Sequence, residues 1–406
     1  MKMFLKMAWR NIWRNKKRTL LTLFSIFIAI FLALFTRSMQ TGFYNSMISN
    51  AVKLSTGYIQ IHGKGFWDDK TINKSLTPSK KLDSLITTNK NITTSIKRVE
   101  SFCLASSGNY TKGTLIFGIE TKKENELNHY SNRIIKGEYL ENDDNSILIA
   151  EKLAEYLKTD VNDTLVLLGQ GYHGITAANQ FLIKGIIKFP IPQLNNQLVF
   201  IPLKASQNFF GLDDKLTSVS IMLKEADKLN ETTNELRSSL SDNYEIMQWQ
   251  EMNKDIVQAI ESDRIGGIIM LGILYLVIGF GVFGTIMMMT MERKKEFAVM
   301  VAIGMKKRKI MFMVLLETLS IGFVAIITGL LVSYPVLLYL HYNPIPLTGD
   351  MAASMEAFGI EPAMPFALNP SLFFEQIFNV ILITIFAILY PLSVTLKFNV
   401  MKALRS

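Results

Sequence analysis

The chain has 406 residues, of which 49% are apolar, and a formal net charge of +9. This length is sufficient for two or three domains. The single cysteine, Cys103, excludes an internal disulfide and a cysteine-based zinc site. A basic excess can indicate nucleic-acid binding, but here it is confined to three short segments, which is typical of a membrane protein instead.

Four apolar runs are long enough to cross a membrane as helices. About 20 apolar residues span the hydrocarbon core of a bilayer. The runs contain no charged residue except Glu317 in the third. We therefore predict transmembrane helices at residues 19–36, 265–291, 310–340 and 376–396.

The distribution of Lys and Arg predicts how these helices are oriented. Residues 1–18, 292–309 and 397–406 carry 17 basic and 2 acidic side chains, a net charge of +15, whereas the rest of the chain carries −6. Basic segments stay on the cytoplasmic side. Both termini and the segment 292–309 are therefore predicted to be cytoplasmic, and residues 37–264 and 341–375 to be extracytoplasmic.

The first 18 residues are predicted to form a cytoplasmic amphipathic helix, not a cleaved signal peptide. Trp9 and Trp13 belong to an apolar face, and Lys2, Lys6 and Arg10 recur every fourth residue on another face. The long basic region and the absence of a small-residue cleavage site favour an uncleaved anchor. This helix either only anchors the chain or also contacts a cytoplasmic partner.

Residues 37–264 are predicted to form one large domain of mixed α and β structure. Alternating or short apolar runs predict strands at 57–62, 114–119, 146–150, 164–168, 181–187, 198–201 and 218–223. Helical patterns follow at 151–157, 225–240 and 249–264. Three glycines within 169–180 predict a projecting hairpin loop. The predicted fold class is a membrane protein with four transmembrane helices and a large α+β extracytoplasmic domain between spans 1 and 2.

Motifs for catalysis or for cofactor binding are not found in the sequence. There is no G-x-x-x-x-G-K-[ST] pattern, so no P-loop ATP site is predicted. The four histidines lack metal-ligand spacing, and His62 is predicted to lie on the surface of a strand. We expect a non-catalytic chain without a cofactor or a metal.

The segment 292–309, which joins the second and third spans, carries the most informative pattern. Phe297, Met300, Val301 and Gly304 recur at i, i+3, i+4 and i+7, as on one face of a short helix. That face either lies on the membrane as a simple connector or enters a groove on a partner.

Several of these segments resemble FtsX-like ABC transporter permeases. Glu292, Arg293, Glu296 and residues 302–304 resemble the cytoplasmic E-R-x-x-E…A-x-G signature of that family. Further similar positions are residues 8–19, Glu317, Gly322, Gly329, Tyr390, Pro391 and residues 399–405. The order of one span, a large domain and three spans is similar to the MacB and lipoprotein-release (LolC/LolE-like) branch.

The resemblance implies a non-catalytic permease that works by mechanotransmission. Two such permeases, identical or paralogous, would pair and bind two separate ATPase subunits. The implied role is lipoprotein release, or transport of another amphiphile, from the inner membrane. The alternatives are a MacB-type efflux permease with a separate ATPase and an FtsX-like regulator of cell-wall hydrolases. The implied ATPase-coupling residues are Glu292, Arg293, Glu296, Phe297, Met300, Val301 and Gly304.

Two further candidate sites follow from the resemblance. Glu317 is either a functional intramembrane carboxylate or the partner of Lys306 or another basic residue near the membrane surface. In lipoprotein-release permeases a loop of the outer domain recruits a periplasmic carrier. The comparable segment here is 169–180, with Tyr172, His173 and Ile175 as candidate contacts. The expected partners are thus ATPase subunits, a second permease, membrane lipids and a carrier or lipoprotein, but not nucleic acid.

Overall fold

The computed structural model describes residues 16–189, 191–350 and 362–397, together with Arg10, Ala352 and Met355. Most of the predicted amphipathic helix at 1–18 and of the tail at 397–406 lies outside the described residues. The chain divides into two compact units. The first comprises Met1–Asn45, Ala259–Pro346 and Met364–Ser406, and the second comprises Ser46–Gln258 and Leu347–Ala363.

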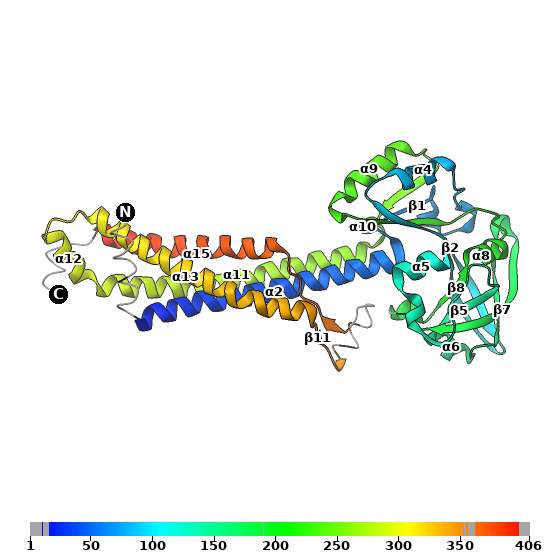
Figure 1. Cartoon of the computed structure of the whole chain (residues 1–406), viewed down its shortest axis with the longest axis horizontal. Helices are drawn as coiled ribbons and strands as arrows, with labels where there is room; N and C mark the ends of the chain where they lie inside the picture. The colour runs from blue at the N-terminus through cyan, green and yellow to red at the C-terminus, as the bar shows by residue number, and fades with distance from the viewer. Residues whose placement is uncertain are drawn as a thin grey trace. The chain divides into compact units, whose positions relative to one another are not determined.

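Four long helices each contain a segment that is long and apolar enough to span a membrane. They are α2 (Lys16–Ala51), α11 (Lys254–Glu292), α13 (Lys307–Tyr342) and α15 (Pro370–Lys397). Figure 1 shows them running side by side, and their facing side chains, such as Leu34, Val282 and Ala325, form one buried core. Gly329 of α13 lies against Ile30 of α2, so the absence of a side chain permits this close approach. The prediction of four transmembrane helices is confirmed.

A single ten-stranded sheet organises the second unit. Its strands are β1 (Ile59–Gly63), β2 (Ile92–Ser107), β3 (Tyr110–Ile119), β4 (Ile134–Gly137), β5 (Ser146–Ala150), β6 (Thr164–Gln170), β7 (Thr176–Ile187), β8 (Leu198–Pro202), β9 (Ser218–Leu223) and β10 (Tyr244–Gln248). Its helices are α3 (Phe66–Asp69), α4 (Lys80–Thr88), α5 (Thr121–Asn128), α6 (Glu151–Leu157), α7 (Pro192–Asn195), α8 (Leu203–Phe210), α9 (Leu229–Ser239) and α10 (Trp249–Met252). A π-helical segment, η1 (Val52–Thr56), follows α2.

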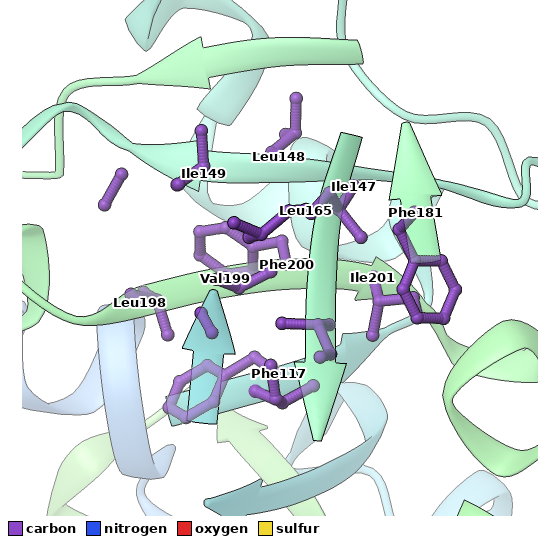
Figure 2. Close-up of a cluster of buried hydrophobic side chains, with 14 of the residues drawn as sticks. Phe117, Ile147, Leu148, Ile149, Leu165, Phe181, Leu198, Val199, Phe200 and Ile201 are labelled. Atoms are coloured by element: carbon purple, nitrogen blue, oxygen red, sulfur yellow. The ribbon is translucent and has the colours of Figure 1, made fainter. Parts of the chain in front are cut away.

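Six of the strands close into a ring. β2 pairs with β3, β3 with β8, β8 with β5, β5 with β7, β7 with β6, and β6 pairs back with β2. Apolar side chains of these strands, among them Ile149, Leu165 and Phe200, pack into one core (Figure 2). Cys103 lies in the same core, where burial raises the pKa of its thiol to about 12. Closure leaves no free edge along this ring.

A second core lies under β10, β1 and β9, whereas the tenth strand, β4, pairs with β7 of the ring. β10, β1 and β9 follow one another in the sheet, and β9 pairs with the first half of β2. Ile61 of β1 and Ile221 of β9 pack with Leu82 of α4 and Leu236 of α9. β2 therefore belongs to both halves of the domain, since its second half pairs with β3 and β6.

The structure corrects two of the sequence predictions and adds a long strand that was not predicted. The predicted loop 169–180 is wrong in its extent, because residues 176–180 belong to β7 and only 171–175 connect the two strands. The predicted helix 249–264 is interrupted at Asn253, which has a non-helical backbone and separates α10 from α11. The 16-residue strand β2 was not predicted as a strand.

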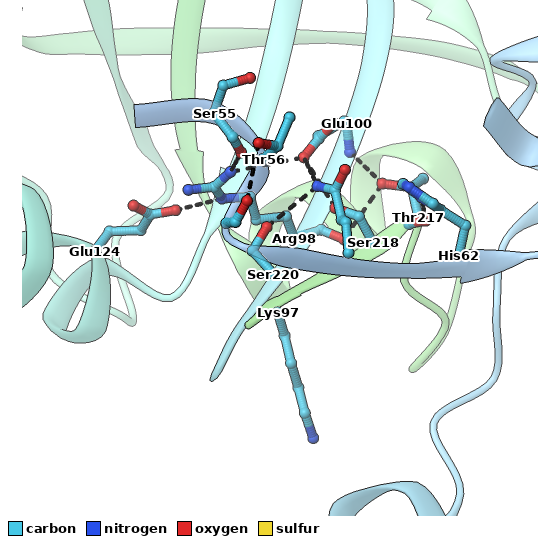
Figure 3. A network of polar contacts seen from close by, with 12 residues as sticks. Ser55, Thr56, His62, Lys97, Arg98, Glu100, Glu124, Thr217, Ser218 and Ser220 are labelled. Atoms are coloured by element: carbon cyan, nitrogen blue, oxygen red, sulfur yellow. Dashed lines mark hydrogen bonds and ion pairs between the residues drawn. The ribbon is translucent and has the colours of Figure 1, made fainter. Parts of the chain in front are cut away.

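Arg98, in β2, is the centre of a buried polar network (Figure 3). Its Nε donates to Oε1 of Glu124 in α5 at 2.5 Å, and its Nη1 donates to the carbonyl oxygen of Ser55 in η1. Burial disfavours the charged guanidinium, but Glu124 and Glu100 more than offset this and hold the pKa of Arg98 above its ordinary value. The network therefore fastens η1 to β2 and α5.

His62 of β1 was predicted on the strand surface, and this prediction is wrong. The side chain is fully buried, because the rings of Phe66 and Trp67 pack against it, with their centres 5.3 and 5.7 Å from the imidazole. Nδ1 lies 3.2 Å from the carbonyl oxygen of Thr217, so Nδ1 carries the proton that donates this bond. Burial lowers the pKa of His62 from 6.5 to about 4.

The depressed pKa of His62 predicts a loss of stability in acid. Between about pH 6.5 and 4 the unfolded chain binds a proton at this residue and the folded chain does not. The contribution of neutral His62 is therefore complete above pH 6.5 and is lost as the pH falls toward 4, by about 3 kcal/mol. We expect His62→Gln, which keeps a donor for Thr217, to reduce the difference in unfolding free energy between pH 7 and pH 4. An unchanged difference would contradict this assignment.

Candidate functional site

The segment between α11 and α13 forms a short helix, α12 (Lys294–Ala302). The helix ends because Gly304 adopts a positive φ of 103°, which turns the chain toward α13. In the same turn the N–H groups of Gly304 and Met305 donate to the carbonyl oxygens of Val301 and Met300, each at 2.9 Å. The glycine of the resembling motif therefore has a local structural role at the end of α12.

The apolar face of α12 predicted from periodicity packs against α13. Phe297 and Ala298 are buried in a cluster with Ile310, Met313 and Val314 of α13. Met300 and Val301 are half-buried against the same cluster. Phe297 is 1% exposed, so its ring serves as an anchor between two helices of one chain.

The opposite side of α12 is exposed, and we call it the outer face of α12. Its largest apolar side chains are Ile303, 81% exposed, and Val299, 47% exposed. Lys295, Glu296 and Ala302 are also exposed there. Val299 and Ile303 were not among the residues proposed from periodicity, although Ile303 lies within the resembling Ala302–Gly304 motif. The inner face of α12 is thus covered by α13, whereas Val299 and Ile303 are left uncovered by the described part of the chain.

A buried ion pair joins the start of this segment to α13. Nη1 of Arg293 lies 2.6 Å from Oε2 of Glu317, and both residues are less than 10% exposed. Nε of Arg293 also donates to Oε2 of Glu296 at 3.2 Å, and its guanidinium lies 5.3 Å from the centre of the Phe297 ring. Glu317 therefore pairs with a basic residue near the end of a span, as one of the two alternatives predicted, and that residue is Arg293.

A cavity of about 10 Å³ adjoins this pair, between Thr290, Phe297 and Thr318. Its volume suits about one water molecule. Arg293, which follows α11, thus contacts both α12 and α13 through polar or ring contacts. Glu292 lies at the end of α11, outside the ion pair and exposed.

The connection between β6 and β7 is a tight turn, η4 (Tyr172–Gly174). Tyr172 is half-buried against the core, with Nζ of Lys215 4.7 Å from its ring centre. The N–H of His173 donates to Oδ1 of Asn73 at 2.7 Å. Of the three candidate contact residues, Ile175 is the apolar side chain that projects, at 58% exposed.

Metal binding has no obvious site in the part of the chain that the structure describes. No group of three or more His, Cys, Asp or Glu side chains lies together there in a way that could hold an ion.

Two family models match the chain. Residues 268–400 match the FtsX-like permease C-terminal model, and residues 19–239 match the MacB-like periplasmic core domain. The second match covers more than half of the chain.

Two curated relatives are similar to the chain over part of their length. The lipoprotein-releasing system transmembrane protein LolC of Neisseria meningitidis serogroup B (strain ATCC BAA-335 / MC58) is 21% identical over 252 residues, which is 59% of this chain and 60% of the relative. The uncharacterized ABC transporter permease YknZ of Bacillus subtilis (strain 168) is 24% identical over 198 residues, 46% of this chain and 47% of the relative. The chain thus spans about half of the length of these relatives.

Two solved domains are similar to part of the chain, with low TM-scores. The periplasmic region of MacB from Actinobacillus actinomycetemcomitans has a TM-score of 0.36 and 13% identity, covering 51% of this chain and 94% of that domain. The extracellular domain of the noncanonic ABC-type transporter YknZ from Gram-positive bacteria has a TM-score of 0.33 and 14% identity, covering 47% of this chain and 99% of that domain.

Proposed function

The chain belongs to the FtsX-like permeases with a MacB-like periplasmic core domain, and from this premise we propose that it couples ATP hydrolysis in separate subunits to work outside the cytoplasm. Two permeases, identical or paralogous, pair in the inner membrane, with both termini on the cytoplasmic side. Two ATPase subunits bind beneath them. The observation that carries this proposal is the attachment of α12 to α13 by Phe297 and by the Arg293–Glu317 pair.

This attachment supports a mechanical role for α12. The outer face of α12 is the surface that we assign to the ATPase, and the inner face is packed on α13. Because the ion pair and the apolar cluster both resist separation, a displacement of α12 by the ATPase moves α13 with it. The movement then passes through the helices to the main part of the second unit, Ser46–Gln258, which we call the outer domain. This mechanism is known as mechanotransmission.

The substrate class that we propose is a lipoprotein or another amphiphile released from the membrane. The similarity to LolC supports this class. The one charged side chain within the four predicted spans, Glu317, is also paired with Arg293, so its charge does not line a hydrophilic path. A MacB-type efflux permease with a separate ATPase is the second candidate, favoured by the match of residues 19–239 to the MacB-like domain.

The outer face of α12 can be tested by paired substitutions. We expect the Val299→Asp, Ile303→Asp variant to lose at least about tenfold in capture and ATP turnover of the ATPase, because carboxylates are costly to bury in an apolar contact. The measurement is co-purification and ATPase activity of the full complex. The matched control is Ile135→Asp, an exposed isoleucine of the outer domain. Normal assembly and turnover in the double variant would remove the coupling assignment. Phe297→Asp is a poorer probe, since Phe297 is buried within its own chain.

We also propose that the β6–β7 turn contacts a periplasmic carrier through Ile175. The turn is held by the Asn73 and Lys215 contacts, so its one projecting apolar side chain is presented in a fixed position. Ile175→Glu is expected to reduce carrier capture in a pull-down by about tenfold. Thr176→Glu, an exposed neighbour, is the control. Unchanged carrier capture by the Ile175→Glu variant would contradict the assignment of this turn to carrier binding.

A further inference from the structure

An apolar groove of about 520 Å³ lies between α13 and α15. Leu316, Leu319 and Phe323 of α13 form one wall, and Ile381 of α15 forms part of the other. The groove exists because the helices meet at Gly322 and Thr384, where one residue has no side chain and the other has a short one. In a membrane, the hydrocarbon of the lipids is the medium that fills such a surface.

The length of the groove corresponds to one lipid leaflet. Its lining on α13 runs from Leu316 to Ile326, which at ~1.5 Å per residue is about 15 Å. The hydrocarbon core of a bilayer is about 30 Å thick, so one leaflet is about half of that. A single acyl chain therefore fits along the groove from end to end.

Two basic side chains lie above one end of this groove. Arg308 and Lys309 are both exposed and belong to the first turn of α13. Lys309 precedes Leu316 by about 10 Å along the helix. Successive residues of an α-helix are rotated by about 100° around its axis. Phe312, Leu316 and Phe323 therefore form one row along α13, and Arg308 and Lys309 lie on either side of this row. A negative group placed above the groove would thus meet a positive charge on each side.

We propose that this groove binds one acyl chain of an anionic phospholipid whose phosphate is held by Arg308 and Lys309. The inference depends on α13 and α15 lying in a membrane, and not on the proposed coupling to an ATPase. The lipid comes from the leaflet that faces Arg308. Bound there, it packs against the same helix, α13, to which α12 is attached.

A second groove of the same helical bundle provides an internal control. It has a volume of about 320 Å³ and lies between α11 and α15, lined by Gly279 and Phe280 among others. No Lys or Arg occurs between residues 265 and 292 of α11. This groove therefore offers hydrocarbon contacts without a comparable pair of positive charges on α11.

The test is native mass spectrometry of the full chain in detergent, titrated with phosphatidylglycerol or phosphatidylcholine of the same acyl chains. We expect phosphatidylglycerol to bind more tightly, and Arg308→Gln, Lys309→Gln to weaken it by about fivefold per charge removed. Ser320→Phe, which places a ring in the groove, is expected to abolish the bound lipid. Gly279→Phe, which fills the second groove, is expected to leave it unchanged.

Either of two sets of results would overturn the proposal. Equal affinity for the two lipids, or no effect of removing both charges, would exclude headgroup recognition by Arg308 and Lys309. Bound phosphatidylglycerol that survives in Ser320→Phe and is lost in Gly279→Phe would place the lipid in the other groove. The charge-removing variant alters exposed side chains only, so the test does not depend on whether Ser320→Phe folds.

Discussion

Replacing Arg98 by methionine is expected to lower the free energy of unfolding of the chain by about 3–5 kcal/mol. The substitution leaves Glu124 buried, at 1% exposed, without its cationic partner. It also removes the donor to the carbonyl oxygen of Ser55. Since the remaining carboxylate must either stay charged in an apolar surrounding or take up a proton, most of the cost comes from the partner that is left behind.

Denaturant unfolding of the full chain in detergent, followed by tryptophan fluorescence, measures this effect. The matched control is Lys136→Met, which breaks an exposed pair with Asp160 and is expected to cost no more than ~1 kcal/mol. The double variant Arg98→Met, Glu124→Leu removes both charges and is expected to regain part of the loss. A double variant as unstable as the single one would show that packing, and not the unpaired charge, decides the cost.

Replacing Arg293 by methionine is expected to reduce the ATP-driven activity of the assembled complex by at least about tenfold. Methionine can fill the space between α12 and α13, but it cannot pair with the buried Glu317. Without that pair, the start of α12 is held mainly by the apolar cluster around Phe297. The ATPase would then move α12 with less movement of α13. The ATPase would still bind, but the ATP-driven activity of the complex would be reduced.

The measurement compares ATPase binding with ATP-driven release of substrate from proteoliposomes, or with ATP turnover if the substrate is not in hand. Lys295→Met, on the outer face of α12, is the control for loss of a positive charge in the same segment. Arg293→Lys is expected to be intermediate, because an ammonium keeps the charge but not the planar fork that serves both Glu296 and Glu317. Full activity in Arg293→Met would refute the role of the pair in coupling.

Local patterns in the sequence were sufficient to predict several elements of the outer domain. The run 146–150 and the helical pattern 151–157 coincide with β5 and α6, because a short apolar run followed by an amphipathic turn leaves few alternatives. β2 was missed because polar side chains interrupt it throughout. Its strand structure depends on partners distant in sequence, such as the pairing of Cys103 with Gly169, which no local pattern encodes.

The candidate site was predicted as a segment but not as a surface. Periodicity correctly gathered Phe297, Met300 and Val301 on one side of a helix. It could not tell whether that side meets another protein or the next helix of the same chain, since both burials have the same pattern. For Glu317, the lone charge in a span marked a position of interest, but its pairing with Arg293 required the packing of α12 on α13.

Because β2 pairs with strands of both halves of the outer domain, it affects how that domain unfolds. If the strand leaves the core of the ring, its first half also leaves β9, and the second core loses one side. Arg98, between these two halves, would lose its partners at the same time. The two halves of the domain are therefore expected to melt in one cooperative transition, with similar protection of their amides from hydrogen exchange. A force applied through α2 and η1 would accordingly be borne by the whole domain as a single unit.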